Sequence, residues 1–371
     1  MKILLISNSI IEYDGRLREL VKIAKGIGDT YYISRALPSS ENEKFHYVFS
    51  SSGLFSYIKF VRYCLRVARN INNNDPIDVI FADNRKAIFP AILIRNIMKI
   101  KHAIYDSREL YLLKESKSIS NFVGCLLERL FINKFDVVVC ANSQRSKIMK
   151  DLFDLKSVPL VYENIRKLNF STEIINMQVY EQKYKEIFTD GSFVIIATDG
   201  FSKARGKDKL IEAIKKLGKK YSLVLAGKIT EQDKNKLNEI SERYKNIYIV
   251  GLLSEQELKY VLNKCNIGFV SYPMDTYNNI YCASGKVYEF LFEGLPVLTS
   301  KNPPLLELCE KYKVGISTED FLSAILEISV NYDFYKNNVF DMQKTVSVEY
   351  NNNILLKQLK NSLYMLNNDD L

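Results

Sequence analysis

The stretch Ile195-Ile196-Ala197-Thr198-Asp199-Gly200-Phe201-Ser202-Lys203-Ala204-Arg205-Gly206-Lys207-Asp208 decides how this chain is expected to fold. Its pattern predicts a buried strand, then a loop that carries glycines and cations, then a helix that begins near Asp208. Backbone N–H groups and the helix dipole attract anions at such a turn. Lys203 and Arg205 add full charges, and an arginine can hold two phosphate oxygens at once. Two interpretations stay open for this stretch alone: a phosphate-binding turn, or an ordinary strand–turn–helix with solvated lysines.

The same alternation of short apolar runs and amphipathic segments extends in both directions along the chain. In the first part, strands are expected at 2–7, 31–34, 46–49, 79–82, 102–105 and 137–141. The helices between them are expected at 17–25, 56–70, 89–98 and 121–131, with a further helix capped by Ser143. In the second part, strands are expected at 193–197, 222–226, 247–250, 267–270 and 296–299, with helices at 207–217, 234–244, 255–263 and 286–292. This alternation is typical of parallel sheets covered by helices on both faces.

A polar, irregular segment at 158–191, with a helix expected at 174–185, separates the two sets and is interpreted as the linker. The sequence therefore predicts an α/β protein with two Rossmann-like domains that face each other across a cleft. Their expected extents are residues 1–167 and 168–349, and a ligand is expected at the C-terminal ends of the strands. The final helix, expected at 354–366, can belong to either domain. The segment from about 350 to 371 is expected to be able to pack back on the first domain.

Length and composition exclude several classes of protein. A chain of 371 residues corresponds to roughly two domains at ~150 residues each. Its 47% hydrophobic and 26% charged residues are typical of a globular protein. No apolar run reaches the ~18 residues of a membrane-spanning helix, and the first apolar run is too short for a signal peptide, so we expect a cytoplasmic location. Six cysteines without a CxxC pair, and only two histidines, argue against a zinc site or a disulfide framework.

The net charge of +9 is unevenly distributed. Residues 1–190 contain 29 Lys and Arg against 21 Asp and Glu, a net +8, which leaves +1 for the remainder. A basic half suggests a polyanion, an anionic membrane face or a phosphorylated substrate. Solvated surface lysines are the alternative explanation. No helix-turn-helix, finger or RNP motif accompanies the charge, so specific nucleic-acid binding is not expected.

A second informative stretch is Cys282-Ala283-Ser284-Gly285-Lys286-Val287-Tyr288-Glu289-Phe290-Leu291-Phe292-Glu293-Gly294-Leu295-Pro296-Val297. Ser284 and Gly285 precede a helix, so their amides can face a phosphate. Glu289 lies one turn further on, where a carboxylate can accept both hydroxyls of a ribose. A helix with a surface carboxylate is the alternative. The apolar residues on both sides of Glu289 argue against it, because a carboxylate there should be paired.

Taken in order, the two stretches and the segments 224–227 and 248–254 resemble the C-terminal half of GT-B glycosyltransferases, specifically glycosyltransferase family 4. The shared pattern is a glycine followed by basic residues, two strands that end in glycine, and a Glu-containing helix that runs into Gly-x-Pro-Val. It covers about residues 193–315. The N-terminal half resembles the same group more weakly, at Tyr13-Asp14-Gly15-Arg16, at Tyr105-Asp106-Ser107-Arg108-Glu109 and at Val161-Tyr162-Glu163-Asn164.

The resemblance implies a transferase that moves a sugar from a nucleotide-sugar co-substrate, taken as a UDP-sugar on family frequency, without a metal or a cofactor and with retention of configuration. Lys203 and Arg205 would bind the diphosphate, and Glu289 the ribose. The remaining donor-binding positions would be Gly200, Gly251, Leu252, Ser284, Gly285 and Lys286. Because charge builds on the leaving diphosphate, cations there favour the transition state over the ground state. Glu109 is added as a catalytic candidate.

Two positions depart from the family pattern. Cys282 stands where a second glutamate is common, and Arg108 stands where the family has a histidine. Arginine cannot act as a base, although it can bind phosphate or orient Glu109. Two alternatives therefore stay open: a glycosyltransferase-like binding or scaffold subunit without catalysis, and a nucleotide-sugar epimerase of the same fold. An epimerase usually needs histidines in the cleft, and this chain has only two.

The acceptor side is assigned from charge and resemblance. Asp14, Gly15, Arg16 and Arg108 are expected near the acceptor. The helix at 56–70 carries a basic stripe of Lys59, Arg62, Arg66 and Arg69, with Ile58, Val61, Leu65 and Ala68 expected on the opposite side. Such a helix can rest on anionic lipid, with ~1 kcal/mol from each cation; a solvated surface helix is the alternative. We therefore expect a lipid-linked or saccharide acceptor in cell-surface polysaccharide synthesis, at the cytoplasmic membrane face.

Overall fold

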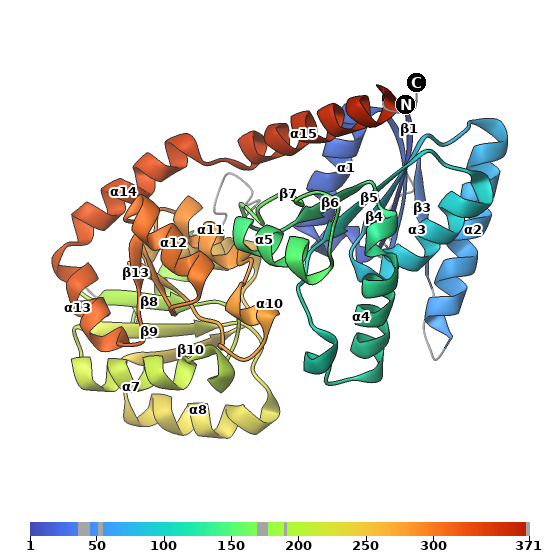
Figure 1. The fold of residues 1–371 in the computed structure, drawn as a ribbon. Coiled ribbons are helices and arrows are strands. Elements are labelled where there is room, and N and C mark those ends of the chain that lie inside the picture. The colour runs from blue at the N-terminus through green and yellow to red at the C-terminus, as the bar shows by residue number, and fades with distance from the viewer. Residues whose placement is uncertain (36–44, 51–54, 169–176, 189–190, 369–371) are drawn as a thin grey trace. The chain divides into compact units, whose positions relative to one another are not determined.

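The computed structural model describes residues 1–35, 45–50, 55–168, 177–188 and 191–368. The chain divides into two compact units, each with its own sheet (Figure 1). The first unit comprises Met1–Asn164 and Val348–Leu371, and the second comprises Ile165–Ser347. The expected extents had placed these boundaries after residues 167 and 349.

The first unit contains a seven-stranded parallel sheet in the order β3-β2-β1-β4-β5-β6-β7. Its strands are β1 (Lys2–Ile10), β2 (Asp29–Arg35), β3 (His46–Val48), β4 (Val79–Asp83), β5 (His102–Ser107), β6 (Val137–Cys140) and β7 (Leu160–Val161). Its helices are α1 (Gly15–Ile27), α2 (Ser56–Asn74), α3 (Arg85–Met98), α4 (Ile119–Phe131), α5 (Ser143–Leu152) and α15 (Val348–Asn368). Short 3-10 turns occur at Ile11–Tyr13, Leu113–Glu115 and Ile132–Lys134. The strand order reverses between β1 and β4, the position where ligands bind in open parallel sheets.

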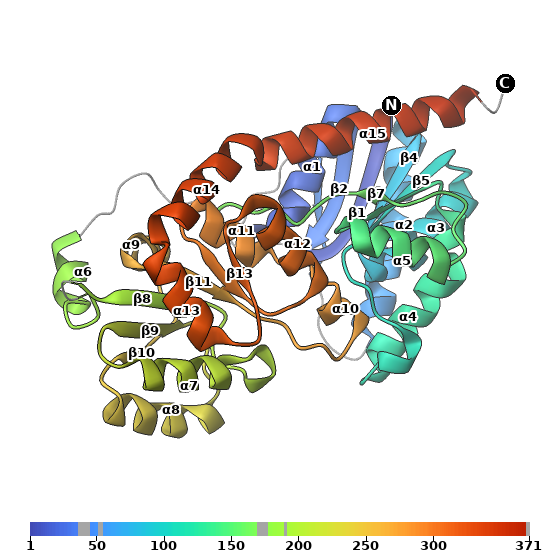
Figure 2. The same cartoon turned by 60° about the vertical axis from the view of Figure 1, so that its left-hand side comes forward.

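The second unit contains a six-stranded parallel sheet in the order β10-β9-β8-β11-β12-β13, and Figure 2 shows its helices from another side. The strands are β8 (Phe193–Ala197), β9 (Tyr221–Ala226), β10 (Ile247–Gly251), β11 (Ile267–Val270), β12 (Val297–Thr299) and β13 (Gly315–Ser317). The helices are α6 (Met177–Lys183), α7 (Lys207–Leu217), α8 (Glu231–Arg243), α9 (Glu255–Lys264), α10 (Tyr277–Ile280), α11 (Gly285–Phe292), α12 (Pro303–Tyr312), α13 (Phe321–Val330) and α14 (Tyr332–Thr345). A 3-10 turn at Lys203–Arg205 precedes α7. Apolar clusters cover both faces of the sheet.

The predicted α/β class and its parallel sheets are confirmed, with differences at element ends. Ser143 is the first helical residue of α5, and the capping side chain is that of Asn142, whose Oδ1 accepts the N–H of Arg145 at 2.8 Å. The helix predicted at 89–98 begins earlier, at Arg85, because Asn84 caps it. The helix predicted at 174–185 is observed as α6, and residues 174–176 lie outside the described residues.

The C-terminal helix α15 packs on the first unit. Leu355, Leu359 and Leu363 recur every four residues, are almost completely buried, and belong to the same apolar cluster as Leu20 and Ala24 of α1. Polar contacts secure the start of the helix, since the Asn351 side chain donates to the carbonyl of Glu163 at 2.9 Å. This spacing puts one apolar stripe against α1, which explains why the helix belongs to the first unit.

Replacing Leu359 with alanine tests this packing. The side chain is fully buried, so Leu359→Ala should lower the free energy of unfolding by about 2–5 kcal/mol, through lost burial and the cavity left behind. Urea unfolding followed by circular dichroism measures the loss. Met365→Ala, at a position 65% exposed on the same helix, is the control and should stay within about 0.5 kcal/mol of the parent. Equal effects of the two changes would contradict the assigned packing.

Helix α4 is attached to its sheet by a buried carboxyl group. Glu128 is 1% exposed and accepts hydrogen bonds from the Tyr105 hydroxyl at 2.5 Å and the Ser107 hydroxyl at 3.1 Å, both on β5. Burial raises the pKa of Glu128 to about 7, and the two hydroxyl donors and Arg85 counteract only part of that rise. The folded protein therefore binds this proton more tightly than the unfolded chain does.

This raised pKa predicts a pH dependence of stability. Between about pH 4.5 and about pH 7 the folded state holds more protons on Glu128 than the unfolded state, so this contribution to stability is complete below about 4.5 and is lost as the pH rises through about 7. Glu128→Gln keeps an acceptor for both hydroxyls but cannot ionise. It should match the parent at low pH and be the more stable protein above pH 7.

The measurement is urea unfolding of both proteins across this pH range. Glu327→Gln is the control, because Glu327 also accepts a tyrosine hydroxyl, that of Tyr335 at 2.9 Å, but is exposed. The control should leave the pH profile unchanged. If the free energies of unfolding of the parent and Glu128→Gln differ by the same amount at every pH, Glu128 does not titrate as stated.

Candidate functional site

In the second unit, the loops that follow β8, β9 and β10 are joined at one edge of the sheet. The N–H of Gly200 donates to the carbonyl of Ala226 at 2.9 Å, and the N–H of Gly227 donates to the carbonyl of Gly251 at 2.6 Å. Gly200 has a φ of 72°, and a Cβ there would lie 2.0 Å from the carbonyl oxygen of Lys228. Only glycine fits that backbone, so the loop of the opening sequence stretch is held tightly against its neighbour.

Cations of this loop gather around one carboxylate. Asp199 pairs with Arg205, Nη1 to Oδ2 at 3.1 Å, and also with the ammonium group of Lys207. The Arg205 guanidinium lies over the ring of Tyr272, with its Cζ 4.5 Å from the ring centroid. Lys207 is 1% exposed, although lysine is rarely buried so completely. With one carboxylate against two cations, this cluster carries a net positive charge.

A third cation belongs to the same electrostatic environment. Burial lowers the pKa of Lys207, Asp199 opposes that effect, and the charges of Arg205 and Lys286 lower the pKa further. Lys286 lies in the first turn of α11, so the end of β8 and the start of α11 are close enough for their cations to repel one another. An anion bound between them would relieve this repulsion.

Two buried polar atoms without partners among the described residues lie beside the N-terminus of α11. Ser284 is the N-cap residue, but its side chain makes no capping bond, and among the described residues its Oγ has no hydrogen-bond partner. The same is true of Nε of Arg166. A Cβ on Gly285 would lie 2.0 Å from this Nε, so the guanidinium lies directly against the helix start. Unpaired buried donors beside a helix N-terminus are suited to an anionic ligand.

Glu289 lies one turn further along α11 and is 7% exposed. Its Oε1 is 3.1 Å from Nη2 of Arg166, and its Oε2 is 2.8 Å from Nζ of Lys286. The expectation that a carboxylate in this apolar helix should be paired is therefore fulfilled. Each carboxylate oxygen has two lone pairs, so Glu289 can still accept hydrogen bonds from a ligand.

Three other positions predicted to bind a donor, and Cys282, which was named as a departure from the expected pattern, also lie in the second unit. Lys203 is exposed on the 3-10 turn before α7. Gly251 ends β10, and Leu252 after it is 77% exposed. Cys282 is buried, at 2% exposure, two residues before Ser284. Lys203 thus lies on the turn before α7, Gly251 and Leu252 lie at the end of β10, and Cys282 lies just before α11.

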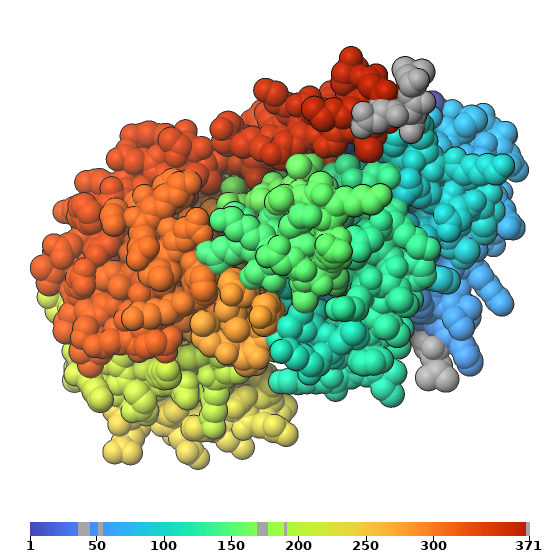
Figure 3. Space-filling view, in the orientation of Figure 1, coloured from blue at the N-terminus to red at the C-terminus, as the bar shows by residue number. Residues whose placement is uncertain are grey.

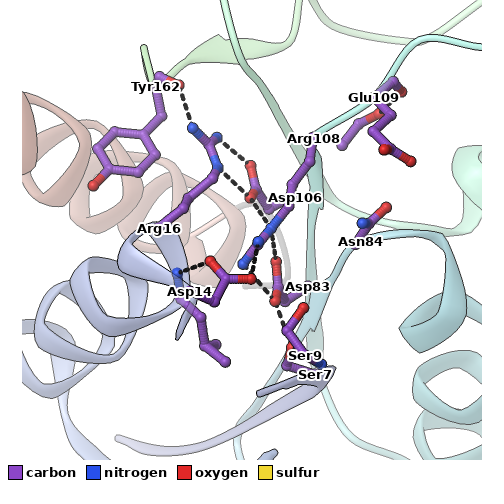
Figure 4. Close-up of polar contacts among 12 residues, drawn as sticks. Ser7, Ser9, Asp14, Arg16, Asp83, Asn84, Asp106, Arg108, Glu109 and Tyr162 are labelled. Carbon is purple, nitrogen blue, oxygen red and sulfur yellow. Dashed lines mark hydrogen bonds and ion pairs between the residues drawn. The ribbon is translucent and has the colours of Figure 1, made fainter. Parts of the chain in front are cut away.

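In the first unit, the predicted acceptor-side residues form a buried cluster of ion pairs (Figure 4). Arg108 binds Asp83 through Nε and Nη2, the latter at 2.7 Å, and also binds Asp14, which caps α1. Arg16 holds Asp106 with two hydrogen bonds, at 2.6 and 2.8 Å. Residues expected to meet an acceptor are thus largely occupied with one another, and Gly15 begins α1 beside them.

Three carboxylates and two guanidinium groups leave this cluster with one excess negative charge. Burial raises the pKa of Asp83 to about 6, Arg108 opposes the rise, and Asp106 and Asp14 add to it. For Asp14, burial also favours the neutral form, but Arg108 and the N–H of Leu17 hold its pKa below the usual value. Asp83 also accepts a hydrogen bond from the Ser7 hydroxyl at 2.6 Å.

A cavity of about 640 Å³ opens beside this cluster, wholly within the first unit. Glu109 lines it and pairs with Arg85 at 2.7 Å. Asn84, at the end of β4, has a φ of 65°, an uncommon conformation for a residue other than glycine. The buried Tyr57 hydroxyl on its wall has no hydrogen-bond partner among the described residues. Further lining comes from Ser9, Arg35, Lys86, Asn121 and Val123.

The basic stripe of α2 is exposed at Lys59, Arg62, Arg66 and Arg69, as the helical spacing predicts. The opposite side differs from the prediction. Ile58 is 50% exposed and Leu65 is only partly buried. The buried face comprises Phe60, Val61, Cys64, Val67, Ala68 and Ile71. The reason is geometric: at 3.6 residues per turn, Ile58 and Leu65 lie beside the basic stripe, whereas residues 60, 64 and 71 lie opposite it and face the core.

Sequence reasoning missed three residues that the structure brings into these sites. Arg166 was included in the linker, and no local pattern marks it. Lys207 follows Gly206 in the quoted stretch, but its burial depends on the surrounding fold. Asp83 ends a fully buried strand, and a carboxylate at the end of a buried run was an available signal.

Among the described residues, no group of three or more His, Cys, Asp or Glu side chains is arranged to hold a metal ion. In the same part of the chain, no helix combines the length and the apolar character required to cross a membrane. All six cysteines are buried free thiols.

Comparison of the sequence with known protein families finds no match, and comparison with curated proteins finds none either. Solved structures do match. HepE from Anabaena in complex with UDP-glucose is 16% identical, with a TM-score of 0.68 over 98% of this chain and 100% of that chain. Sucrose-phosphate synthase from Thermosynechococcus elongatus is 14% identical, with a TM-score of 0.70 over 98% and 99%. UDP-GlcNAc 2-epimerase from Methanocaldococcus jannaschii is 10% identical, with a TM-score of 0.57 over 88% and 91%.

At 10–16% identity, these likenesses concern the fold. They match nearly the whole chain, so both sheets and their connections are those of proteins such as HepE and sucrose-phosphate synthase. The resemblance deduced from the sequence is confirmed at this level: the chain has the GT-B fold, with two Rossmann-like domains.

Proposed function

We propose that this protein is a glycosyltransferase that transfers a sugar from a nucleotide-sugar donor, with a UDP-sugar as the expected donor. One observation carries the proposal: Arg205, Lys207 and Lys286 interact electrostatically beside the N-terminus of α11, where Ser284 Oγ has no partner among the described residues. A pyrophosphate would satisfy this arrangement, because it offers several anionic oxygens to cations and to unpaired donors. HepE, which has the same fold, is described in complex with UDP-glucose.

The proposed chemistry uses these cations on the leaving group. When the bond between the sugar and the diphosphate breaks, negative charge accumulates on the diphosphate oxygens. Lys203 and Arg205 bind those oxygens most strongly at that moment, which lowers the barrier. Glu289 accepts the ribose hydroxyls, and Gly251 and Leu252 lie against the base. In this proposal the positive charge comes from side chains, without a metal ion or a cofactor, and the product retains the anomeric configuration, which NMR of the product would test.

The acceptor is proposed to bind at the first unit. The cavity beside Glu109 offers Arg85, Lys86 and Asn84, groups that bind hydroxyls and phosphates. We propose a lipid-linked or saccharide acceptor in the synthesis of a cell-surface polysaccharide, with the protein at the cytoplasmic face of the membrane. Glu109 is the candidate for contact with the reacting hydroxyl, since it is 40% exposed in its side chain whereas the Asp83 side chain is not exposed.

An epimerase reaction has less support from the residues of this chain. His46 stacks on Tyr32 at 4.4 Å and shares a hydrogen bond of 2.7 Å with Ser34. His102 shares a hydrogen bond of 2.9 Å with Asn367. Both histidines thus serve internal contacts in the first unit. Incubation with UDP-GlcNAc and no acceptor distinguishes the reactions, because only an epimerase would yield an isomerised sugar.

Variants of Arg205 and Glu289 test the donor site. Arg205→Ala should weaken UDP binding about 10- to 100-fold, because it removes charge-assisted hydrogen bonds of about 1.5–3 kcal/mol. Glu289→Ala should weaken binding of UDP more than binding of inorganic pyrophosphate, since only UDP carries the ribose. Isothermal titration calorimetry measures both ligands, and transfer to an acceptor panel is measured in parallel.

Each variant has a matched control. Arg243 also lies over a tyrosine ring, that of Tyr244 at 5.5 Å, but outside the proposed site, so Arg243→Ala should leave UDP binding unchanged. Glu212 also forms an i,i+3 pair with a lysine, as Glu289 does, but it is exposed on α7. Glu212→Ala is therefore the control for Glu289→Ala and should leave UDP binding unchanged. Parent-like UDP binding in both Arg205→Ala and Glu289→Ala would refute the site. UDP binding without any transfer would favour the non-catalytic alternative.

A further inference from the structure

Helix α4 exposes apolar side chains along one complete face. Ile119, Phe122, Val123, Leu126 and Leu130 are between 37% and 85% exposed. Their spacings of three, four, seven and eleven residues from Ile119 place them on a single stripe of the helix. Helix α4 lies at the surface of the first unit, at the teal-green segment in Figure 3. Single exposed apolar residues are ordinary, but five on one helix face indicate a surface that is normally covered.

The inner face of α4 is not mainly apolar. The exposed side chains are therefore not the excess of a helix that is apolar on all sides. The residues of α4 that are buried are Cys125 and Glu128. A carboxyl group thus faces the sheet, Leu127 and Phe131 are only partly buried, and the five apolar side chains of the stripe face outward. Ordinary surface helices have the opposite arrangement, because burying apolar area is what stabilises them. The outward stripe therefore costs solvation free energy unless something apolar covers it.

The charges around the stripe indicate what covers it. Lys114 and Lys117 are exposed before the helix, and Arg129 and Lys134 are exposed at its end. Apolar side chains between cations match a lipid surface that has acyl chains below anionic headgroups. A protein partner with an apolar interface would not require cations at both ends of the helix.

The flanks of α4 connect this stripe to the cavities of the first unit. Asn121, Val123 and Gly124 line the polar cavity that also contains Glu109. On the other flank, Cys125 and Arg129 line a second, more apolar cavity of about 330 Å³. A helix seated in the headgroup layer would bring both openings to the lipid surface.

We propose that α4 inserts its apolar stripe into the interface of an anionic membrane. The basic stripe of α2, which sequence reasoning favoured as the contact, cannot insert, because the apolar face of α2 is buried in the unit. Helix α3 packs against both α2 and α4, so the cations of α2 can add long-range attraction from the same helical layer. This inference deepens the proposed function, which places the acceptor at a membrane. Vesicle binding does not require sugar transfer, so the two can fail separately.

The absence of tryptophan from this chain allows a direct test. Phe122→Trp places a single fluorophore in the stripe of the full-length protein. On adding vesicles of phosphatidylcholine and phosphatidylglycerol, its emission should shift to the blue, and brominated lipid should quench it. Val330→Trp is the control, since Val330 is 81% exposed at the end of α13 in the second unit, and its emission should not change.

Vesicle co-sedimentation supplies the second readout. The double variant Phe122→Ser, Leu126→Ser should bind anionic vesicles at least about tenfold more weakly than the parent. The double variant Arg62→Glu, Arg66→Glu on α2 should lose less vesicle affinity than that. Both changes affect exposed side chains, so UDP binding by each variant should stay at the parent value and report intact folding. Vesicles of phosphatidylcholine alone should bind the parent protein weakly.

Three results would overturn the inference. The first is unchanged vesicle binding by the α4 double variant. The second is equal behaviour of Phe122→Trp and Val330→Trp with brominated lipid. The third is a concentration-dependent dimer, seen by light scattering without lipid and abolished by the α4 double variant, which would assign the stripe to a second copy of this chain.

Discussion

Parallel strands all end at the same edge of a sheet, and this constraint determines where the polar chemistry of both units accumulates. In the first unit, the charged side chains at that edge pair with one another: Arg108 pairs with Asp14 and Asp83, and Arg16 pairs with Asp106. In the second unit they do not, because Ser284 Oγ and Arg166 Nε lack partners among the described residues. One edge is closed by internal ion pairs, and the other offers donors to an anion.

The difference between the two edges has an energetic reason. Buried charges are tolerated when each has a partner, and removing one partner leaves the other uncompensated. Arg108 therefore stabilises the first unit through its pairs with Asp14 and Asp83, whatever it does for an acceptor. Burial is the main cause of the lowered pKa of Lys207, and repulsion from Arg205 and Lys286 at the second edge lowers it further. In the proposed function, a bound diphosphate would relieve that repulsion.

In helix α4 a carboxyl group is buried and apolar side chains are exposed. Its buried carboxyl group is held by Tyr105 and Ser107, and the apolar side chains that usually fill such a position face outward instead. A lone amphipathic pattern in sequence does not reveal which side faces the core, because both orientations have the same period. Contacts with β5 and α3, which only the folded chain provides, determine which side of α4 faces the core.

The sequence by itself determined the alternation of strands and helices, the parallel sheets and the glycine turn after β8, because these depend on local periodicity and on backbone conformations that few residues adopt. It also indicated Arg205, Ser284 and Glu289, since a helix start beside a strand end has a recognisable pattern. The tertiary structure alone decided that Arg166, far from α11 in the chain, lies against Gly285 and pairs with Glu289. It likewise decided that Lys207 is buried and that α4 faces outward, because burial is a property of the whole packed unit and not of any local segment.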